Sequence, residues 1–243
     1  MVTKPIRIVP LHPAPAAAPA APPRLTYRGG PLLSAVEVIS AFWGAEWQGA
    51  DAILRRQVND FFTFVLTSTL MEQLSEYSIP GTPIGPGSLA GTATIADQQP
   101  GSMVTDAQIH DLIQSRIADG TLPATTANSL YFIYLPPGVA VDVDGQESCT
   151  SLCGYHDAIR GAIYYAVMPY PGCAACVGGL ALVDALTSTS SHELCEAVTD
   201  PVPGQGWYDD SNGEIGDICA WQTKPLGPWT VQLEWSNQNN ACI

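Results

Sequence analysis

The apolar residues of this chain fall into short blocks whose spacing predicts alternating strands and helices. Residues 36–43 are β-branched and aromatic, which predicts a buried strand. Residues 51–77 instead repeat apolar positions at helical spacing, so we expect a long helix there. A second helix is expected from Thr105 to Ile117, since Gly120 follows as a stop signal. Further strands are predicted at residues 91–96, 130–135, 163–168 and 231–235.

The order of these elements predicts an α+β fold in which a mixed β-sheet packs on the long helix. A last helix, beginning between residues 182 and 191, ends before Pro201 because the residue preceding a proline disfavours the α conformation. The first residues are rich in alanine and proline, a composition typical of an extended linker. We therefore expect residues 1–24 to form a flexible arm and residues 25–243 to form a single domain.

The strongly negative net charge of the chain excludes some classes of binding partner. The chain has 23 acidic and 9 basic residues and a net charge of −14, so its surface repels nucleic acids and anionic membranes. No run of 18 apolar residues is present, which predicts that no segment spans a membrane. We expect a monomer with a peptide or protein substrate. Prolines interrupt any apolar core of a signal peptide near Met1, so export by another route, or a replaced signal, is expected.

Seven cysteines are many for a cytosolic protein of 243 residues and favour a secreted protein held by disulfides. A zinc knuckle formed by the first four cysteines is the alternative, but their C-x3-C and C-x2-C spacings depart from the usual pattern. An odd cysteine remains, and its place in a helix favours a small buried side chain. The spacing suggests pairs of Cys149 with Cys153, Cys173 with Cys176 and Cys219 with Cys242, leaving Cys195 unpaired.

The most informative stretch of the sequence reads His-Glu-x-x-Glu, from His192 to Glu196. Residues four apart share one face of a helix, so the imidazole of His192 and the carboxylate of Glu196 can bind one zinc ion. Glu193 is adjacent to the first ligand, where a general base can reach a water molecule held by the metal. The pattern follows the logic of the H-E-x-x-H helix of metalloproteases, with glutamate in place of the second histidine.

A catalytic zinc site needs a third protein ligand and an open position. We rank Asp217 first, because it follows a glycine turn beside Cys219, and Glu214 second. The one that is not a ligand is expected to accept the ring N–H of His192. Asp200 is expected to cap the helix or orient a ligand. His156 either stabilises an oxyanion during catalysis or is a satisfied structural histidine.

Calcium is a secondary possibility for the metal. The acid-rich turn over residues 207–217 offers the oxygen ligands that Ca²⁺ prefers. Residues 142–145 read Asp-Val-Asp-Gly, which hints at a structural calcium loop but lacks the bidentate glutamate of a full EF-hand. We interpret residues 142–145 as a turn.

Several motifs together resemble a known family. Ser-His-Glu-x-x-Glu-x-x-Thr-Asp-Pro at residues 191–201 is followed by Gly-Trp-Tyr at 206–208 and by Glu-Ile-Gly-Asp-x-Cys at 214–219. Leu-Thr-Tyr-Arg-Gly-Gly-Pro-Leu-Leu at 25–33 and Cys-x-x-x-Cys-Gly-Tyr-His at 149–156 complete the set. These motifs resemble a group of bacterial secreted proteins related to the plant phosphate-induced, or EXORDIUM-like, family, and they extend over most of the chain.

The resemblance implies a zincin-like, disulfide-stabilised domain in which an edge strand binds an extended peptide beside the metal. The His-Glu-Leu-x-x-Ala-Val-Thr-Asp string is also similar to the zinc helix of thermolysin-like peptidases, over that one helix. The plant relatives lack the His-Glu-x-x-Glu residues, whereas this chain retains them. The function expected is that of a secreted zinc metalloendopeptidase with Glu193 as general base. The alternative is a non-catalytic secreted binding or signalling protein with a structural metal site.

Overall fold

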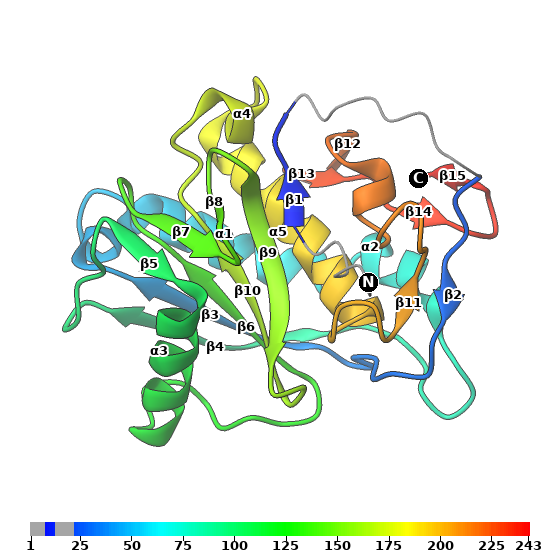
Figure 1. The fold of residues 1–243 in the computed structure, drawn as a ribbon, viewed down its shortest axis with the longest axis horizontal. Coiled ribbons are helices and arrows are strands. Elements are labelled where there is room, and N and C mark those ends of the chain that lie inside the picture. The colour runs from blue at the N-terminus through cyan, green and yellow to red at the C-terminus, as the bar shows by residue number, and fades with distance from the viewer. Residues whose placement is uncertain (1–7, 13–21) are drawn as a thin grey trace.

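A mixed sheet of six strands forms the centre of the computed structural model, which describes residues 8–12 and 22–243 (Figure 1). The strand order is β1-β9-β10-β6-β3-β4. Strand β9 is antiparallel to both of its neighbours, β1 and β10, whereas β10, β6, β3 and β4 run parallel to one another. The strands are β1 (Ile8–Pro10), β9 (Leu152–Ile159), β10 (Ile163–Met168), β6 (Ser129–Tyr134), β3 (Glu37–Trp43) and β4 (Ser88–Ile95).

One face of this sheet is covered by helices α1 (Ala52–Val65) and α5 (Leu182–Thr199). The single helix expected over residues 51–77 is instead broken into α1, α2 (Thr69–Leu74) and a 3-10 turn, η2 (Ser75–Tyr77). The break occurs because the side chain of Ser68 accepts the backbone N–H of Leu70 and begins a new helix. Apolar periodicity continues through the break, so periodicity alone predicted one helix.

The opposite face packs against α3 (Asp106–Ala118), which begins with a capping box between Thr105 and Gln108. A small sheet of β5 (Met103–Thr105), β7 (Ala140–Val143) and β8 (Gln146–Glu147) lies beside it. The β7–β8 hairpin turns through Asp144 and Gly145, both at positive φ. Residues 142–145 therefore form the expected turn.

The remaining elements form a loop-rich part that packs on α5 and α2 (Figure 1). The strand expected near residues 231–235 is divided into β13 and β14, which pair with different partners. The elements of this part are β2 (Thr26–Tyr27), β11 (Trp207–Tyr208), η3 (Asp217–Cys219), β12 (Thr223–Leu226), β13 (Trp229–Gln232), β14 (Trp235–Ser236) and β15 (Ala241–Cys242). Elsewhere, η1 (Ala45–Gln48) packs beside α1, and α4 (Ala174–Val177) packs beside β9 and α5.

Part of the predicted flexible arm belongs to the main sheet. Residues 8–10 form β1, which pairs with the edge of β9, and the side chain of Val9 is 2% exposed. This part of the prediction is wrong, because an apolar Ile-Val pair precedes the alanine- and proline-rich stretch. The remainder of the arm, residues 1–7 and 13–21, lies outside the described residues.

Three disulfide bonds cross-link the fold, but two of the predicted cysteine pairings are wrong. The bonds join Cys149 to Cys173, Cys153 to Cys176 and Cys219 to Cys242, and Cys195 is buried and unpaired. The close neighbours in sequence do not pair because the chain folds back and sets α4 beside β9. The zinc knuckle is also excluded, since its cysteines are consumed by the first two bonds. Such a set of disulfides is typical of an oxidising compartment.

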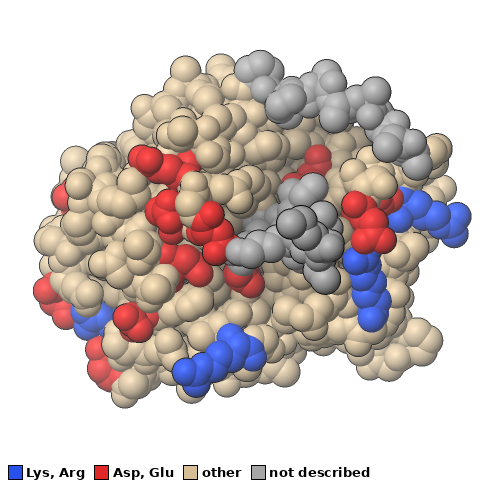
Figure 2. Space-filling model, in the orientation of Figure 1, with Lys and Arg blue, Asp and Glu red and all other residues tan. Residues whose placement is uncertain are grey.

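The surface of the described residues is acidic, as the composition predicts. Figure 2 shows Asp and Glu side chains in several groups on the face drawn, and fewer Lys or Arg side chains. Among the described residues, no helix has the length and apolar character needed to cross a membrane.

Candidate metal centre

The candidate centre lies where β9 passes over α5. Side chains alternate along a strand, so Gly154 and His156 face α5 while Tyr155 packs on the other side of the sheet. Gly154 permits the close approach of β9 to α5, because a Cβ at this position would lie 2.9 Å from Thr189 Cγ2 and 3.2 Å from Glu193 Oε1. The run of small Ser and Thr residues before His192 is therefore buried under the sheet rather than exposed to solvent.

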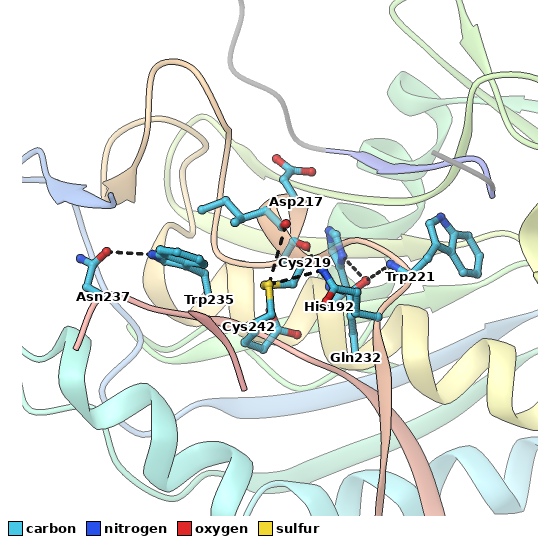
Figure 3. The surroundings of a disulfide bond; sticks show 12 residues. His192, Asp217, Cys219, Trp221, Gln232, Trp235, Asn237 and Cys242 are labelled. Atoms are coloured by element: carbon cyan, nitrogen blue, oxygen red, sulfur yellow. Dashed lines mark hydrogen bonds between the residues drawn. A yellow bond between two sulfur atoms is a disulfide. The ribbon is translucent and has the colours of Figure 1, made fainter. Parts of the chain in front are cut away.

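Gln232 on β13 fixes the orientation of His192. The Oε1 atom of Gln232 lies 3.0 Å from His192 Nδ1 and accepts the backbone N–H of Trp221, while its Nε2 donates to the carbonyl of Gly216 (Figure 3). The amide oxygen therefore faces the ring, and Nδ1 carries the proton that it donates. Nε2 is left to face the acidic cluster, where it can hold either a proton or a metal ion.

His192, Glu196 and Asp217 converge as the sequence predicts. Ligand atoms of these three side chains lie within 4.8 Å of one another. His192 Nε2 is 2.9 Å from Glu196 Oε1, yet the ring nitrogen makes no hydrogen bond, because it does not point at that oxygen. Glu196 Oε1 also accepts the backbone N–H of Asp217, which ties η3 to α5. His192 Nε2 and Glu196 Oε1 are thus close without pointing at each other, which is the arrangement of two ligands that bind the same metal ion.

His156 forms a second acidic contact on the neighbouring side of Glu196. Its Nδ1 lies 3.0 Å from Glu193 Oε2 and 3.4 Å from Glu196 Oε2, and its Nε2 lies 3.2 Å from the carbonyl of Asp200. Both ring nitrogens thus face acceptors, so both carry protons and the ring is a cation. His156, Glu193 and Glu196 also have ligand atoms within 4.8 Å of one another, but both ring nitrogens of His156 already face acceptors, so a metal there would have to displace one of these contacts.

Burial and charge perturb the acids and bases of this cluster. Burial lowers the pKa of His156 and His192, but the charges of Glu214 and Glu196 respectively outweigh it and raise both pKa values well above the usual range. Burial raises the pKa of Glu193, despite its bond to His156. Burial also acts to raise the pKa of Glu196, but His192 and His156 outweigh it and hold the pKa at about 2.

The donor set fits a divalent cation. His192 Nε2, Glu193 Oε1 and Glu196 Oε2 are buried and make no hydrogen bond with the described residues. Orphaned polar atoms of this kind are costly unless an ion or water satisfies them. One neutral imidazole and the carboxylates of Glu196 and Asp217 sum to a charge that one Zn²⁺ neutralises. His192, Glu196 and Asp217 are therefore the residues that would hold the metal.

The structure places the remaining predicted residues in different roles. Glu214 is fully buried with Oε1 3.5 Å from His156 Nε2, so it does not accept the ring N–H of His192 as predicted for the residue left over. Gln232 makes that contact instead. Asp200 accepts backbone N–H groups of residues 204–206 and anchors the loop after α5.

Sequence reasoning missed two polar residues of the C-terminal part. Gln232 is 2% exposed, and Glu234 is fully buried with both carboxylate oxygens unpartnered among the described residues. Burial raises the pKa of Glu234 well above its usual range. The signal available was a strand in which polar residues alternate with Val231 and Leu233, a pattern that usually places the polar face in solvent.

Known proteins resemble this chain only distantly. No family profile matches it. It is 24% identical over 242 residues to Protein EXORDIUM-like 5 of Arabidopsis thaliana, a match that covers 80% of this chain. The chain is thus similar at low identity to one EXORDIUM-like protein. It spans 63% of the length of that relative, so the relative has further sequence with no counterpart here.

A solved structure of a chaperone–substrate complex also matches. The match has 14% identity and a TM-score of 0.37 and covers 76% of this chain and 26% of that chain. At that score the likeness carries no inference about the fold. The mixed α+β architecture with disulfides is established by the structure itself, and its zincin-like character stays a prediction.

Proposed function

We propose that this chain is a secreted zinc-dependent endopeptidase with its metal on His192, Glu196 and Asp217. The observation that supports it most strongly is the convergence of three ligand atoms. His192 Nε2 is buried and lies 2.9 Å from Glu196 Oε1 without bonding it, and ligand atoms of His192, Glu196 and Asp217 lie within 4.8 Å of one another. A divalent cation that displaces the proton of His192 would bind all three side chains. Zinc is favoured because it accepts mixed nitrogen and oxygen ligands.

The other residues of the cluster then have distinct tasks. Zinc would supply Lewis-acid polarisation of the scissile carbonyl. Glu193 Oε1, which is unpartnered among the described residues, takes the proton of the attacking water and passes it to the leaving amine. The raised pKa of Glu193 suits this role, because a general base works best with a pKa near the operating pH. His156 acts as a positioning residue that holds Glu193 Oε2 and stabilises the carboxylate.

A non-catalytic structural metal site is the second candidate, and one observation favours it. His156, His192, Glu193 and Glu196 are all fully buried, and only Asp217 among the proposed ligands is partly exposed. A catalytic site keeps an open position for water and substrate, whereas a structural site is closed by protein ligands. Secretion accords with both candidates through the three disulfides.

The decisive experiment compares metal content and hydrolysis in matched variants. Wild-type protein is expected to hold about one zinc per chain, since the site has one set of ligands. His192→Ala is expected to lose the zinc, whereas His110→Ala, which alters a histidine on α3 across the sheet, keeps it. Glu193→Gln is expected to keep the zinc and lose casein hydrolysis by about 10²–10⁴-fold, with Glu72→Gln, at an exposed side chain of α2, as control.

Each outcome separates the two candidates. If the wild-type protein holds zinc but does not hydrolyse casein, whether or not a chelator is added, the result would support the structural site and contradict the endopeptidase. Full zinc occupancy in His192→Ala would contradict the ligand set. Wild-type hydrolysis by Glu193→Gln would show that the general base lies elsewhere.

A further inference from the structure

The free edge of β9 is occupied by the chain's own N-terminal strand. Ile8 pairs with Tyr155, Val9 with Gly154 and Pro10 with Leu152, all antiparallel. The other side of β9 pairs with β10, so among the described residues the outer edge of β9 is paired by β1 alone. Without β1, the backbone groups along that edge would have no strand partner. Pro10 lacks a backbone donor and is tolerated here only because β1 is itself an edge strand.

Val9 is the one fully buried side chain of β1. Val9 is 2% exposed and packs with Cys153 and Cys176, whereas Ile8, Pro10 and Leu11 are partly exposed and His12 is exposed. The Cys149–Cys173 and Cys153–Cys176 bonds tie α4 to β9 and form the walls of this apolar site. The receiving site is therefore held together by covalent bonds that do not involve β1.

Polar contacts at the end of β1 are directed at its backbone. Trp221 donates its indole N–H to the carbonyl of Pro10 at 2.8 Å, and the backbone N–H of His12 donates to the carbonyl of Ala175 at 2.8 Å. The His12 ring meets the Trp221 ring edge-on at 5.2 Å between centroids. Main-chain pairing, one side-chain pocket and a donor to a carbonyl are the elements by which proteins bind extended peptides.

The occupied edge adjoins the candidate centre. Val9 pairs with Gly154. On the face of the sheet that meets α5, a Cβ added to Gly154 would lie 3.2 Å from Glu193 Oε1. The next residue on the same face of β9 is His156, which bonds Glu193 Oε2. A peptide paired along this edge in the direction of β1 is thus held beside the unpartnered oxygen of Glu193.

From this arrangement we infer that the edge of β9, with the pocket formed by Cys153, Cys176 and Trp221, is a binding site for extended peptides carrying a small β-branched residue. The strand β1 fills it as an intramolecular ligand, and a peptide substrate takes the same place when β1 leaves. Only the hydrolysis of the bound peptide rests on the proposed endopeptidase function. The peptide binding itself stands on the contacts of β1.

The test releases β1 in the full-length protein. Val9→Asp places a charge in the apolar pocket, and Ile53→Asp, at a side chain 62% exposed on α1, is the matched control. The probe is a fluorescein-labelled peptide with the sequence of residues 5–12, followed by fluorescence anisotropy. Because the tethered strand competes at a high effective concentration, Val9→Asp is expected to bind the probe about tenfold or more tightly than Ile53→Asp does.

Two further measurements guard the result. Trp221→Phe loses the donor to Pro10 for the tethered strand and for the probe alike, so we expect its probe binding to stay close to that of Ile53→Asp. A probe with Asp at the position of Val9 is expected not to bind any of them. If Val9→Asp binds the peptide no better than Ile53→Asp does, the inference is overturned.

The binding assay is read without turnover, which separates it from the proposed function. Probe binding by Val9→Asp, with no zinc-dependent cleavage of casein by the wild type or this variant, upholds the peptide site and contradicts the endopeptidase. Zinc-dependent cleavage of casein with equal probe binding by all variants contradicts the peptide site alone.

Discussion

Gln232 determines which nitrogen of His192 is available. Its amide is fixed by a donor bond to Gly216 and by accepting from Trp221, so its oxygen can only accept from His192 Nδ1. The spacing of His192 and Glu196 was predictable because both lie on one helix. Gln232 was not, because it comes from a strand 40 residues away and reaches the ring only through the packing of β13 on α5.

Replacing Gln232 by leucine should therefore weaken zinc binding without removing a ligand. A Gln232→Leu variant leaves Nδ1 with no acceptor and frees the ring to change tautomer. Loss of such a supporting contact typically costs about 10–100-fold in metal affinity. Competition titration against a zinc-binding dye measures the change, and Gln238→Leu, at an exposed residue, is the control. Equal affinities of the two variants would contradict the role of Gln232.

At the scale of elements, the strands and helices with strong periodicity were predictable and β9 was not. Residues 130–135 and 163–168 are apolar runs and form β6 and β10 close to the predicted bounds. The β9 sequence contains Gly154, His156 and Asp157 between its apolar residues, so no period of two indicates a buried strand. These residues suit β9 because it passes over a helix whose own facing residues are small or charged.

The close packing of β9 on α5 predicts that Gly154 tolerates no side chain. Gly154→Ala would place its Cβ 2.9 Å from Thr189 Cγ2, closer than carbon atoms approach. Overpacking of this kind costs about 1–3 kcal/mol in the free energy of unfolding. Urea unfolding measures it against Gly172→Ala, where the nearest atom to a Cβ is 3.9 Å away.

The same substitution distinguishes packing from catalysis. A destabilised Gly154→Ala that also loses hydrolysis in its folded state would indicate that Glu193 has shifted. Stability equal to that of Gly172→Ala would contradict the contact between β9 and α5.

At the scale of the whole molecule, the acidic surface was predictable from composition, but the acidic interior was not. Glu193, Glu196, Glu214 and Glu234 are fully buried, although they come from α5 and from two separate loops of the C-terminal part. Charged residues are rarely buried unless they are paired. The described cluster holds more carboxylates than the two histidines can neutralise. The pKa values of both histidines and of Glu214 are raised, so the folded, metal-free protein keeps protons at pH values where the unfolded chain has lost them.

This proton retention sets the pH dependence of stability in the metal-free state. Histidine titrates at about 6.5 when unfolded, and the raised pKa of His156 and His192 adds stability below that value that is lost as the pH rises through the folded pKa. Burial raises the pKa of Glu214 and Glu234, so the fold also loses stability as the pH rises above their unfolded value of about 4.3. Glu196, with a pKa of about 2, acts in the opposite sense and loses its contribution only as the pH falls through that value.

We therefore expect the metal-free protein to melt at its highest temperature in weakly acidic solution, between about pH 4 and 6, and at a lower temperature near pH 8. Zinc reverses the trend, because it replaces protons on the site and binds the deprotonated forms of His192, Glu196 and Asp217. The rise in melting temperature on adding zinc should thus be larger at pH 8 than at pH 5. Thermal unfolding across this range, with zinc or with a chelator, measures both effects. His192→Ala should show no rise with zinc at either pH. A metal-free protein that grows more stable from pH 5 to pH 8 would contradict the buried acidic cluster.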